Sequence, residues 1–132
     1  MPLPDAPTDR FDLERFVAAQ DLVYPAVLDE LRCGRKQTHW IWFIFRTREE
    51  AAAYIAHPLL SARLLECTEL VLSHVGKTSN QIFGSPDDLK FCSSMTLFAA
   101  VSSRSIFQTA LDHFYKGVED ATTLATLAKW AA

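Results

Sequence analysis

The sequence predicts an all-α fold, a single compact domain of about seven helices packed as a bundle. Apolar residues recur at steps of three and four along most of the chain, which is the spacing of one helix face. Helix start and stop signals separate these stretches, and no segment is a convincing strand. A chain of 132 residues, 49% hydrophobic and 22% charged, has the size and composition of one domain with its own core.

The charge and the cysteines argue against several classes of protein. A net charge of −3 lacks the basic excess of a general nucleic-acid binder, and no window approaches the roughly 18 apolar residues of a membrane span. The N-terminus has no basic segment followed by an apolar run, so we expect a cytoplasmic protein. Cys33, Cys67 and Cys92 form no zinc pattern and no glycine-rich phosphate loop occurs, so we expect neither a metal nor a cofactor. The oligomeric state stays open.

Proline and glycine delimit the first helices. Three prolines predict that residues 1–9 form a flexible arm ahead of a domain over 10–132. Apolar residues at helical spacing predict a helix over about 11–20. Pro25 fits the first turn of a second helix, which ends with Gly34 as its left-handed cap.

The aromatic run His39–Phe45 could by composition be a buried strand or a buried helix. We favour a helix, because nothing else in the chain supplies a partner strand. Thr47 followed by Glu50 is a capping box for a helix over about 48–56, and His57-Pro58 ends that helix.

The second half of the chain begins with the longest helix, over about 59–75. Residues 77–83 form either a turn or a single short helical piece. Ser85 at the N-cap and Pro86 at the first helical position then start a new helix. A serine-rich break leads to a further helix closed by a glycine, and a final helix is capped by one of two residues, Asp120 or Thr122.

Four stretches carry a more specific signal: Arg15-Phe16-Val17-x-Ala19-Gln20, Gly34-Arg35-Lys36-x-Thr38-His39-Trp40-Ile41-Trp42-Phe43-Ile44-Phe45, His57-Pro58-Leu59-Leu60-x-x-Arg63-Leu64, and Ile82-Phe83-Gly84-Ser85-Pro86-Asp87-Asp88-x-Lys90-x-x-Ser93-Ser94-Met95-Thr96-Leu97-Phe98. In them the chain resembles domain-of-unknown-function family 1810, a family of small bacterial proteins. The resemblance spans nearly the whole chain and implies a compact all-α domain. Members often carry the label "calpastatin", but an inhibitor of that name would be disordered and repetitive, unlike this chain.

One departure from the family pattern follows Phe45. In the family, the aromatic run continues into Pro-Gln and a glycine-containing segment of roughly fifteen to twenty residues, longer than ordinary connections. Here Phe45 passes directly to Arg46. Either this protein has lost the loop, or the segment has been left out of the chain's sequence. A loop beside a polar turn is a natural lid, so its absence removes potential site residues.

The turn before the aromatic run carries the first candidate site. Arg35 and Lys36 are cations near a helix start, where free N–H groups also suit a phosphate or a carboxylate. His39 would be the catalytic acid or base, and Trp40 would stack on the ligand. The alternative is a plain helix junction, in which the cations satisfy carbonyl groups, the imidazole bonds to a core carbonyl and the aromatic rings are core.

The second group of candidate residues lies on the helix after the Ser-Pro start. Lys90, Ser93 and Ser94 share one helix face, with Thr96 close behind, and this face could meet the cationic turn in one pocket. Gln20 would orient the ligand there, or else cap the end of its own helix. The alternative for the hydroxyl groups is hydrogen bonding back to the preceding turn.

These residues support two functions from different classes. The first is a pocket for a small anionic or nucleotide-like ligand, with or without acid–base chemistry. The second is a non-catalytic helical module that binds a protein or itself through an exposed apolar strip around Tyr54, Leu59 and Leu60, or at Trp130. The sequence favours the first and does not decide whether the protein is an enzyme.

Overall fold

The computed structural model describes residues 11–37 and 47–131, and within them it is all-α, which confirms the predicted fold class. The eight helices of these residues are α1 (Glu14–Asp21), α2 (Tyr24–Cys33), α3 (Arg48–Ala56), α4 (Pro58–Leu72), α5 (Ser79–Phe83), α6 (Asp87–Val101), α7 (Ile106–Tyr115) and α8 (Ala121–Ala131). No strand occurs in this part of the chain. The expected arm over 1–9 and the expected helix His39–Phe45 lie outside the described residues, as do His39 and Trp40.

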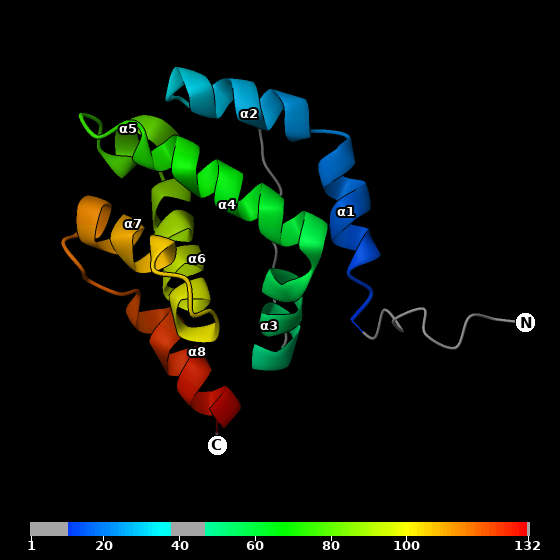
Figure 1. Ribbon diagram of the computed structural model, residues 1–132. Helices are drawn as coiled ribbons and strands as arrows, with labels where there is room; N and C mark the ends of the chain where they lie inside the picture. The colour runs from blue at the N-terminus through cyan, green and yellow to red at the C-terminus, as the bar shows by residue number, and fades with distance from the viewer. Residues whose placement is uncertain (1–10, 38–46, 132) are drawn as a thin grey trace, which may run out of the picture.

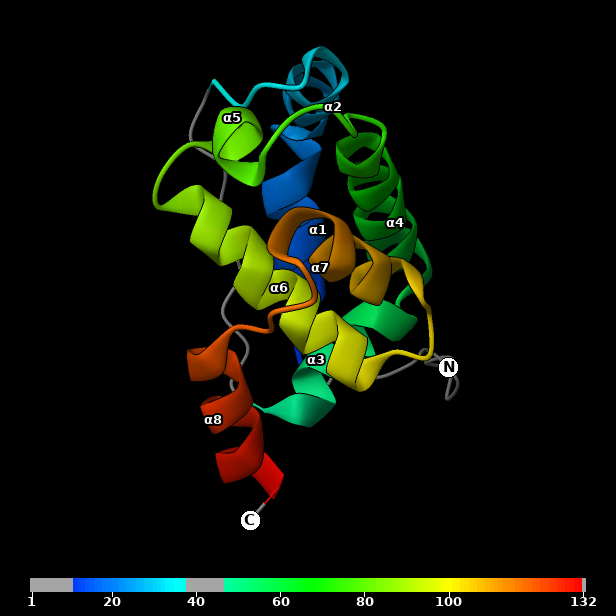
Figure 2. The same cartoon turned by 90° about the vertical axis from the view of Figure 1, so that its left-hand side faces the viewer.

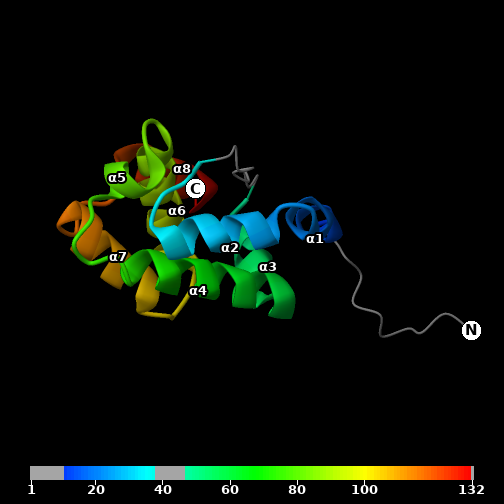
Figure 3. The same cartoon turned by 90° about the horizontal axis from the view of Figure 1, so that it is seen from above.

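The other helices pack around α4 and α6 (Figure 1). α4 contacts α1, α2, α3 and α7, whereas α6 contacts α3, α5, α7 and α8. The view from above shows α2 lying alongside α4 (Figure 3). In the side view, α8 projects beyond α6 and carries the C-terminal end of the chain (Figure 2). Among the helices described, none is both long and apolar enough to cross a bilayer.

Several helix ends follow the sequence signals. Gly34 ends α2 in the left-handed region with φ 73°, where glycine has no steric penalty. The Thr47 side chain accepts a hydrogen bond from the backbone N–H of Glu50 at the start of α3. His57 ends α3 and also caps α4, because its Nδ1 accepts from backbone N–H groups in the first turn of α4. These caps confirm the predicted boundaries between α2 and α4.

Other boundaries differ from the prediction, each for a local reason. The first helix starts at Glu14 and not near 11, because Asp12 has a positive φ of 51° that a helix cannot include. The prediction that Ser85 caps α6 is wrong: Pro86 occupies the N-cap position, and the Ser85 hydroxyl instead accepts from the Asn80 amide at 2.9 Å. Of the two alternatives for 77–83, the structure has the short helix, over 79–83, which begins with a capping box between Thr78 and Gln81.

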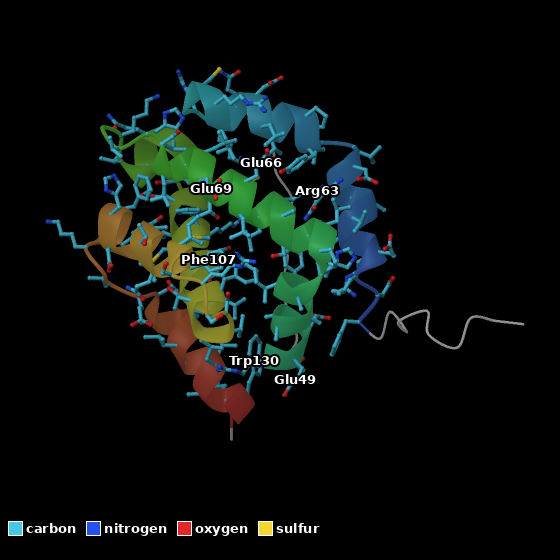
Figure 4. The ribbon with its side chains drawn as sticks, viewed as in Figure 1. Glu49, Arg63, Glu66, Glu69, Phe107 and Trp130 are labelled. Carbon is cyan, nitrogen blue, oxygen red and sulfur yellow. The ribbon has the colours of Figure 1, made fainter. Side chains whose placement is uncertain are left out.

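The core is apolar and rich in aromatic rings. Phe16, Tyr54, Phe98 and Phe107 form a continuous series, with successive ring centroids 5.2, 5.7 and 5.6 Å apart. Phe107 is fully buried and lies at the middle of the molecule (Figure 4). Burying a side chain of this kind contributes about 1.5–3 kcal/mol, so this series stabilises the packing of α1, α3, α6 and α7.

Candidate functional site

A cavity of about 160 Å³ lies between helices α1, α2, α4 and α6. Most of its wall is apolar, contributed by Ala19, Val23, Val27, Leu31, Leu64, Val71, Phe83, Phe91, Met95 and Phe98. α4 supplies residues 63, 64, 67, 68 and 71, and α6 supplies 91, 94, 95 and 98. These steps of three and four mean that each helix turns one stripe toward the cavity.

Three polar side chains of the wall form a hydrogen-bonded chain. Gln20 Nε2 donates to the Tyr54 hydroxyl at 2.8 Å, and Gln20 Oε1 accepts from Arg63 Nη1 at 3.2 Å. The amide therefore joins α1 to both α3 and α4, with its oxygen toward the guanidinium and its nitrogen toward the phenol. Gln20 was predicted from the sequence as a ligand-orienting residue, and the structure places it in the cavity wall.

Arg63 brings a positive charge to this wall. Its Nη2 lies 2.6 Å from Asp21 Oδ1, and its guanidinium carbon lies 4.9 Å from the centre of the Tyr24 ring. The Arg63 side chain is only 16% exposed, whereas Asp21 is 56% exposed. Figure 4 shows Arg63 and Glu66 on the side of α4 that faces α1 and α2, where the Tyr24 hydroxyl donates to Glu66 Oε1 at 2.6 Å.

The phenol and thiol groups of the wall are held in their neutral forms. Burial, the largest cause in each case, raises the pKa of Cys67 to about 11 and that of Tyr54 to about 12. Burial and the hydrogen bond to Glu66 also raise the pKa of Tyr24. Near neutral pH none of these groups is ionised, so none is suited to act as a base or as a thiolate nucleophile.

Ser94 is the polar residue that α6 contributes to the cavity. Its hydroxyl has no hydrogen-bond partner among the residues described, although it sits beside the buried side chains of Phe91, Met95 and Phe98. Polar groups in such surroundings normally have a partner. The hydroxyl is thus available to a molecule that enters the cavity, and Ser94 joins Gln20 as a predicted site residue found in the wall.

Of the other predicted residues, those that the structure describes do not line this cavity. Lys36 Nζ lies 2.7 Å from Asp87 Oδ2, and Lys90 Nζ lies 3.6 Å from Asp87 Oδ1. Both cations therefore neutralise a carboxylate at the start of α6, a pairing that neither the pocket prediction nor its alternative, in which the cations satisfy carbonyl groups, included. Arg35 is exposed to solvent.

The expectation that Lys90, Ser93 and Ser94 share one functional face is also not met. Ser93 Oγ lies 2.6 Å from Thr123 Oγ1, which in turn donates to Asp120 Oδ2 at 2.7 Å, so Ser93 joins α6 to the cap of α8. The reason is geometric: adjacent helical residues point about 100° apart, so Ser94 faces the cavity while Ser93 faces α8. Asp120, one of the two predicted caps, also accepts from the backbone N–H of Thr123.

Thr96 is almost fully buried and bridges two backbone groups. Its hydroxyl donates to the carbonyl of Cys92 at 2.8 Å and accepts from the N–H of Asp120 at 2.9 Å. The hydrogen bond back to the preceding turn was the alternative reading of this residue. Thr96 thus holds α6 against the start of α8, away from the cavity.

Sequence reasoning missed the four titratable side chains of the wall as site residues: Tyr24, Tyr54, Arg63 and Cys67. A signal for Arg63 was present, because it stands three residues after Leu60 and four before Cys67, within the apolar stripe of its helix. A charge at that spacing indicates either a buried ion pair or a site. Among the described residues, no group of three or more His, Cys, Asp and Glu side chains could hold a metal ion.

Comparisons with known proteins agree with the predicted resemblance. A family model described as "Protein of unknown function (DUF1810)" matches residues 10–48 and 46–127. The two matched stretches overlap at residues 46–48, directly after Phe45. The crystal structure of the conserved hypothetical protein Rv1873 from Mycobacterium tuberculosis is similar, with 47% sequence identity and a TM-score of 0.87 over 91% of this chain and 99% of that chain. No curated protein matches the sequence.

Proposed function

The chain belongs to the DUF1810 family of proteins of unknown function, and we propose that it binds a small molecule in the cavity between α1, α2, α4 and α6. The supporting features are a mostly apolar wall and a few convergent polar groups, the usual composition of a ligand site. The observation that carries the proposal is the Ser94 hydroxyl, which faces this cavity without a partner among the described residues. A bound ligand would supply that partner.

The cavity supports binding better than catalysis. No Asp, Glu or His among the described residues lines it, and burial keeps Cys67 and Tyr54 protonated. The described wall therefore offers hydrogen-bond donors and apolar surface but no general base. Acid–base chemistry at His39 stays a prediction, because that residue lies outside the described part of the chain.

The alternative function, a helical module that binds a protein, was expected to use an exposed apolar strip, and most residues of that strip are buried. Tyr54 and Leu60, which were to form an exposed apolar strip, are 5% and 0% exposed. Leu59 is 40% exposed, and Trp130 is half-buried against the core. The strip is therefore interrupted by core residues, and no observation favours this second function over the first.

A screen of thermal stability tests the proposal, because a ligand that binds the folded state raises the melting temperature by mass action. The wild type and Ser94→Leu would be screened against the same library of small molecules. The leucine side chain fills part of the cavity without introducing a polar group. Ala100→Leu, which adds a leucine at an exposed position of the same helix, is the matched control.

We expect some compounds to stabilise the wild type and Ala100→Leu but not Ser94→Leu. If no compound stabilises the wild type, or if Ser94→Leu responds equally, the cavity is not a binding site. A lower melting temperature of unliganded Ser94→Leu would not confuse the result, since each shift is measured against the same variant without compound.

A further inference from the structure

We infer that the ligand of this cavity is a neutral molecule of about the size of benzene that presents a carbonyl oxygen, rather than an anion or a nucleotide. The inference rests on the proposed function and narrows the class of ligand. It departs from the anionic or nucleotide-like ligand expected from the sequence, because that expectation placed Lys36 and Lys90 in the pocket. Both are committed instead to Asp87.

Size is the first argument. The cavity has a volume of about 160 Å³, whereas pockets for drug-sized ligands have about 300–1,000 Å³. An apolar cavity of about 150 Å³ is known to accept benzene. A single ring with one small substituent therefore fits this cavity, and a nucleotide does not.

Charge is the second argument. Arg63 is the cation of the described wall, and Asp21 already compensates it at 2.6 Å. A carboxylate ligand would bring a second negative charge close to Asp21 and would lose its hydration among apolar side chains. The neutral state of Tyr54 and Cys67 has the same origin, because burial at this wall disfavours negative charge.

The free hydrogen-bonding groups supply the third argument. Gln20 uses one amide N–H for Tyr54, and Arg63 uses one N–H for Gln20 and one for Asp21. Their other N–H groups have no acceptor in the part of the chain that the structure describes, and the Ser94 hydroxyl can donate as well. The wall is therefore richer in donors than in acceptors. A neutral ligand complements it best with an oxygen that accepts, as a carbonyl group does.

Three compounds with the same ring distinguish the effect of ligand charge on affinity from the effect of ligand size. They are benzamide, which is neutral, benzoate, which is an anion, and benzylammonium, which is a cation. Binding of each to the full chain would be measured near neutral pH by calorimetry or ligand-observed NMR. We expect benzamide to bind at least about tenfold more tightly than either ion, because each ion must leave water.

Ser94→Ala should weaken benzamide binding about fivefold through the loss of one hydrogen bond. Ser93→Ala is the matched control and should leave the affinity unchanged, since Ser93 contacts Thr123 and not the cavity.

The outcomes separate this inference from the proposed function. If benzoate binds as tightly as benzamide or more tightly, and Ser94→Leu abolishes that binding, the cavity binds ligands but the neutral class is wrong. If none of the three binds while the library screen yields other cavity ligands, the inference fails and the proposed function stands. If benzamide binds equally to Ser94→Leu, or if nothing binds at all, both are overturned.

Discussion

The ammonium group of Lys36 lies 2.7 Å from Asp87 Oδ2, and the two side chains are only 9% and 16% exposed. The backbone N–H of Lys36 also donates to the carbonyl of Ile82 at 2.6 Å. The segment after α2 is thereby fastened to the end of α5 and the start of α6. A residue that the sequence marks as an anion-binding cation is thus, in the described structure, half of a largely buried ion pair.

Removing the charge of Asp87 should destabilise the fold. Asp87→Asn leaves the Lys36 ammonium without this counter-charge in a poorly hydrated position, and we expect the free energy of unfolding to fall by about 2 kcal/mol. Denaturant unfolding followed by circular dichroism measures the change. The control is Asp29→Asn, which breaks the exposed Arg32–Asp29 pair and should change stability by less than about 0.5 kcal/mol. Equal effects of the two variants would contradict the structural role of Lys36.

The neighbouring serines of α6 should behave in opposite ways. Ser93→Ala removes the hydroxyl bonded to Thr123 and should lower the free energy of unfolding by about 1 kcal/mol. Ser94→Ala removes a hydroxyl with no partner among the described residues and should leave stability nearly unchanged. Denaturant unfolding of both variants under one set of conditions tests the difference. A larger loss for Ser94→Ala would mean that its hydroxyl stabilises the empty protein.

Gly34 and Gly76 should respond differently to alanine. A Cβ atom on Gly34 would lie 2.9 Å from ring atoms of His74 and from Lys77 Nζ, and φ is 73° there. Gly34→Ala should therefore lower the free energy of unfolding by about 2 kcal/mol or more. Gly76 has open space around its Cα atom, so Gly76→Ala should be close to neutral. Thermal unfolding compares the two, and tolerance of alanine at residue 34 would contradict the packing of His74 against the end of α2.

The three cysteines should react with a thiol reagent at different rates. Cys33 is exposed, whereas Cys67 lies in the cavity wall and Cys92 is 7% exposed. Burial raises the pKa of both Cys67 and Cys92, so few thiolates form at neutral pH. We expect one fast reaction, lost in Cys33→Ser, and two slow ones that follow unfolding. A fast reaction of Cys67 would show that the cavity wall is open to solvent.

Alkaline pH should lower the free energy of unfolding, because Cys67 and Tyr54 are buried in their protonated forms. The pKa of Cys67 rises from 9.0 to about 11 on folding, and that of Tyr54 rises from 10.0 to about 12. Above about pH 9 the unfolded chain releases these protons before the folded protein does, so the unfolded state gains stability. The contribution is complete below pH 9 and is lost as pH rises through about 11 to 12. Denaturation midpoints that stay constant over this range would contradict the burial of these two groups.

Local signals account for most of the fold that the sequence predicted. The caps at Gly34, Thr47 and His57 depend on neighbouring residues, so they could be recognised without knowing the tertiary structure. The misplaced start of α6 shows the limit of this reasoning. Ser85 has the sequence signature of an N-cap, but its hydroxyl bonds to a side chain of α5, five residues earlier.

The site depends more strongly on tertiary packing. Periodicity predicts which face of a helix is apolar, but it does not predict which two faces enclose a cavity. Gln20 and Ser94 were found because polar residues on apolar faces are unusual. Arg63 was passed over, although it interrupts an apolar stripe in the same way, because its pairing with Asp21 and Gln20 requires α1 to lie against α4.

A solution titration of the isotopically labelled protein with benzamide tests the central claim most directly. If the cavity binds small molecules, the largest changes in amide chemical shift will fall on lining residues of separate helices, including Gln20, Leu64, Thr68 and Ser94, and they will saturate together. The same titration of Ser94→Leu should show none of them. Saturating changes confined to the surface, away from α1, α4 and α6, or changes in the wild type that Ser94→Leu retains in full, would contradict the account.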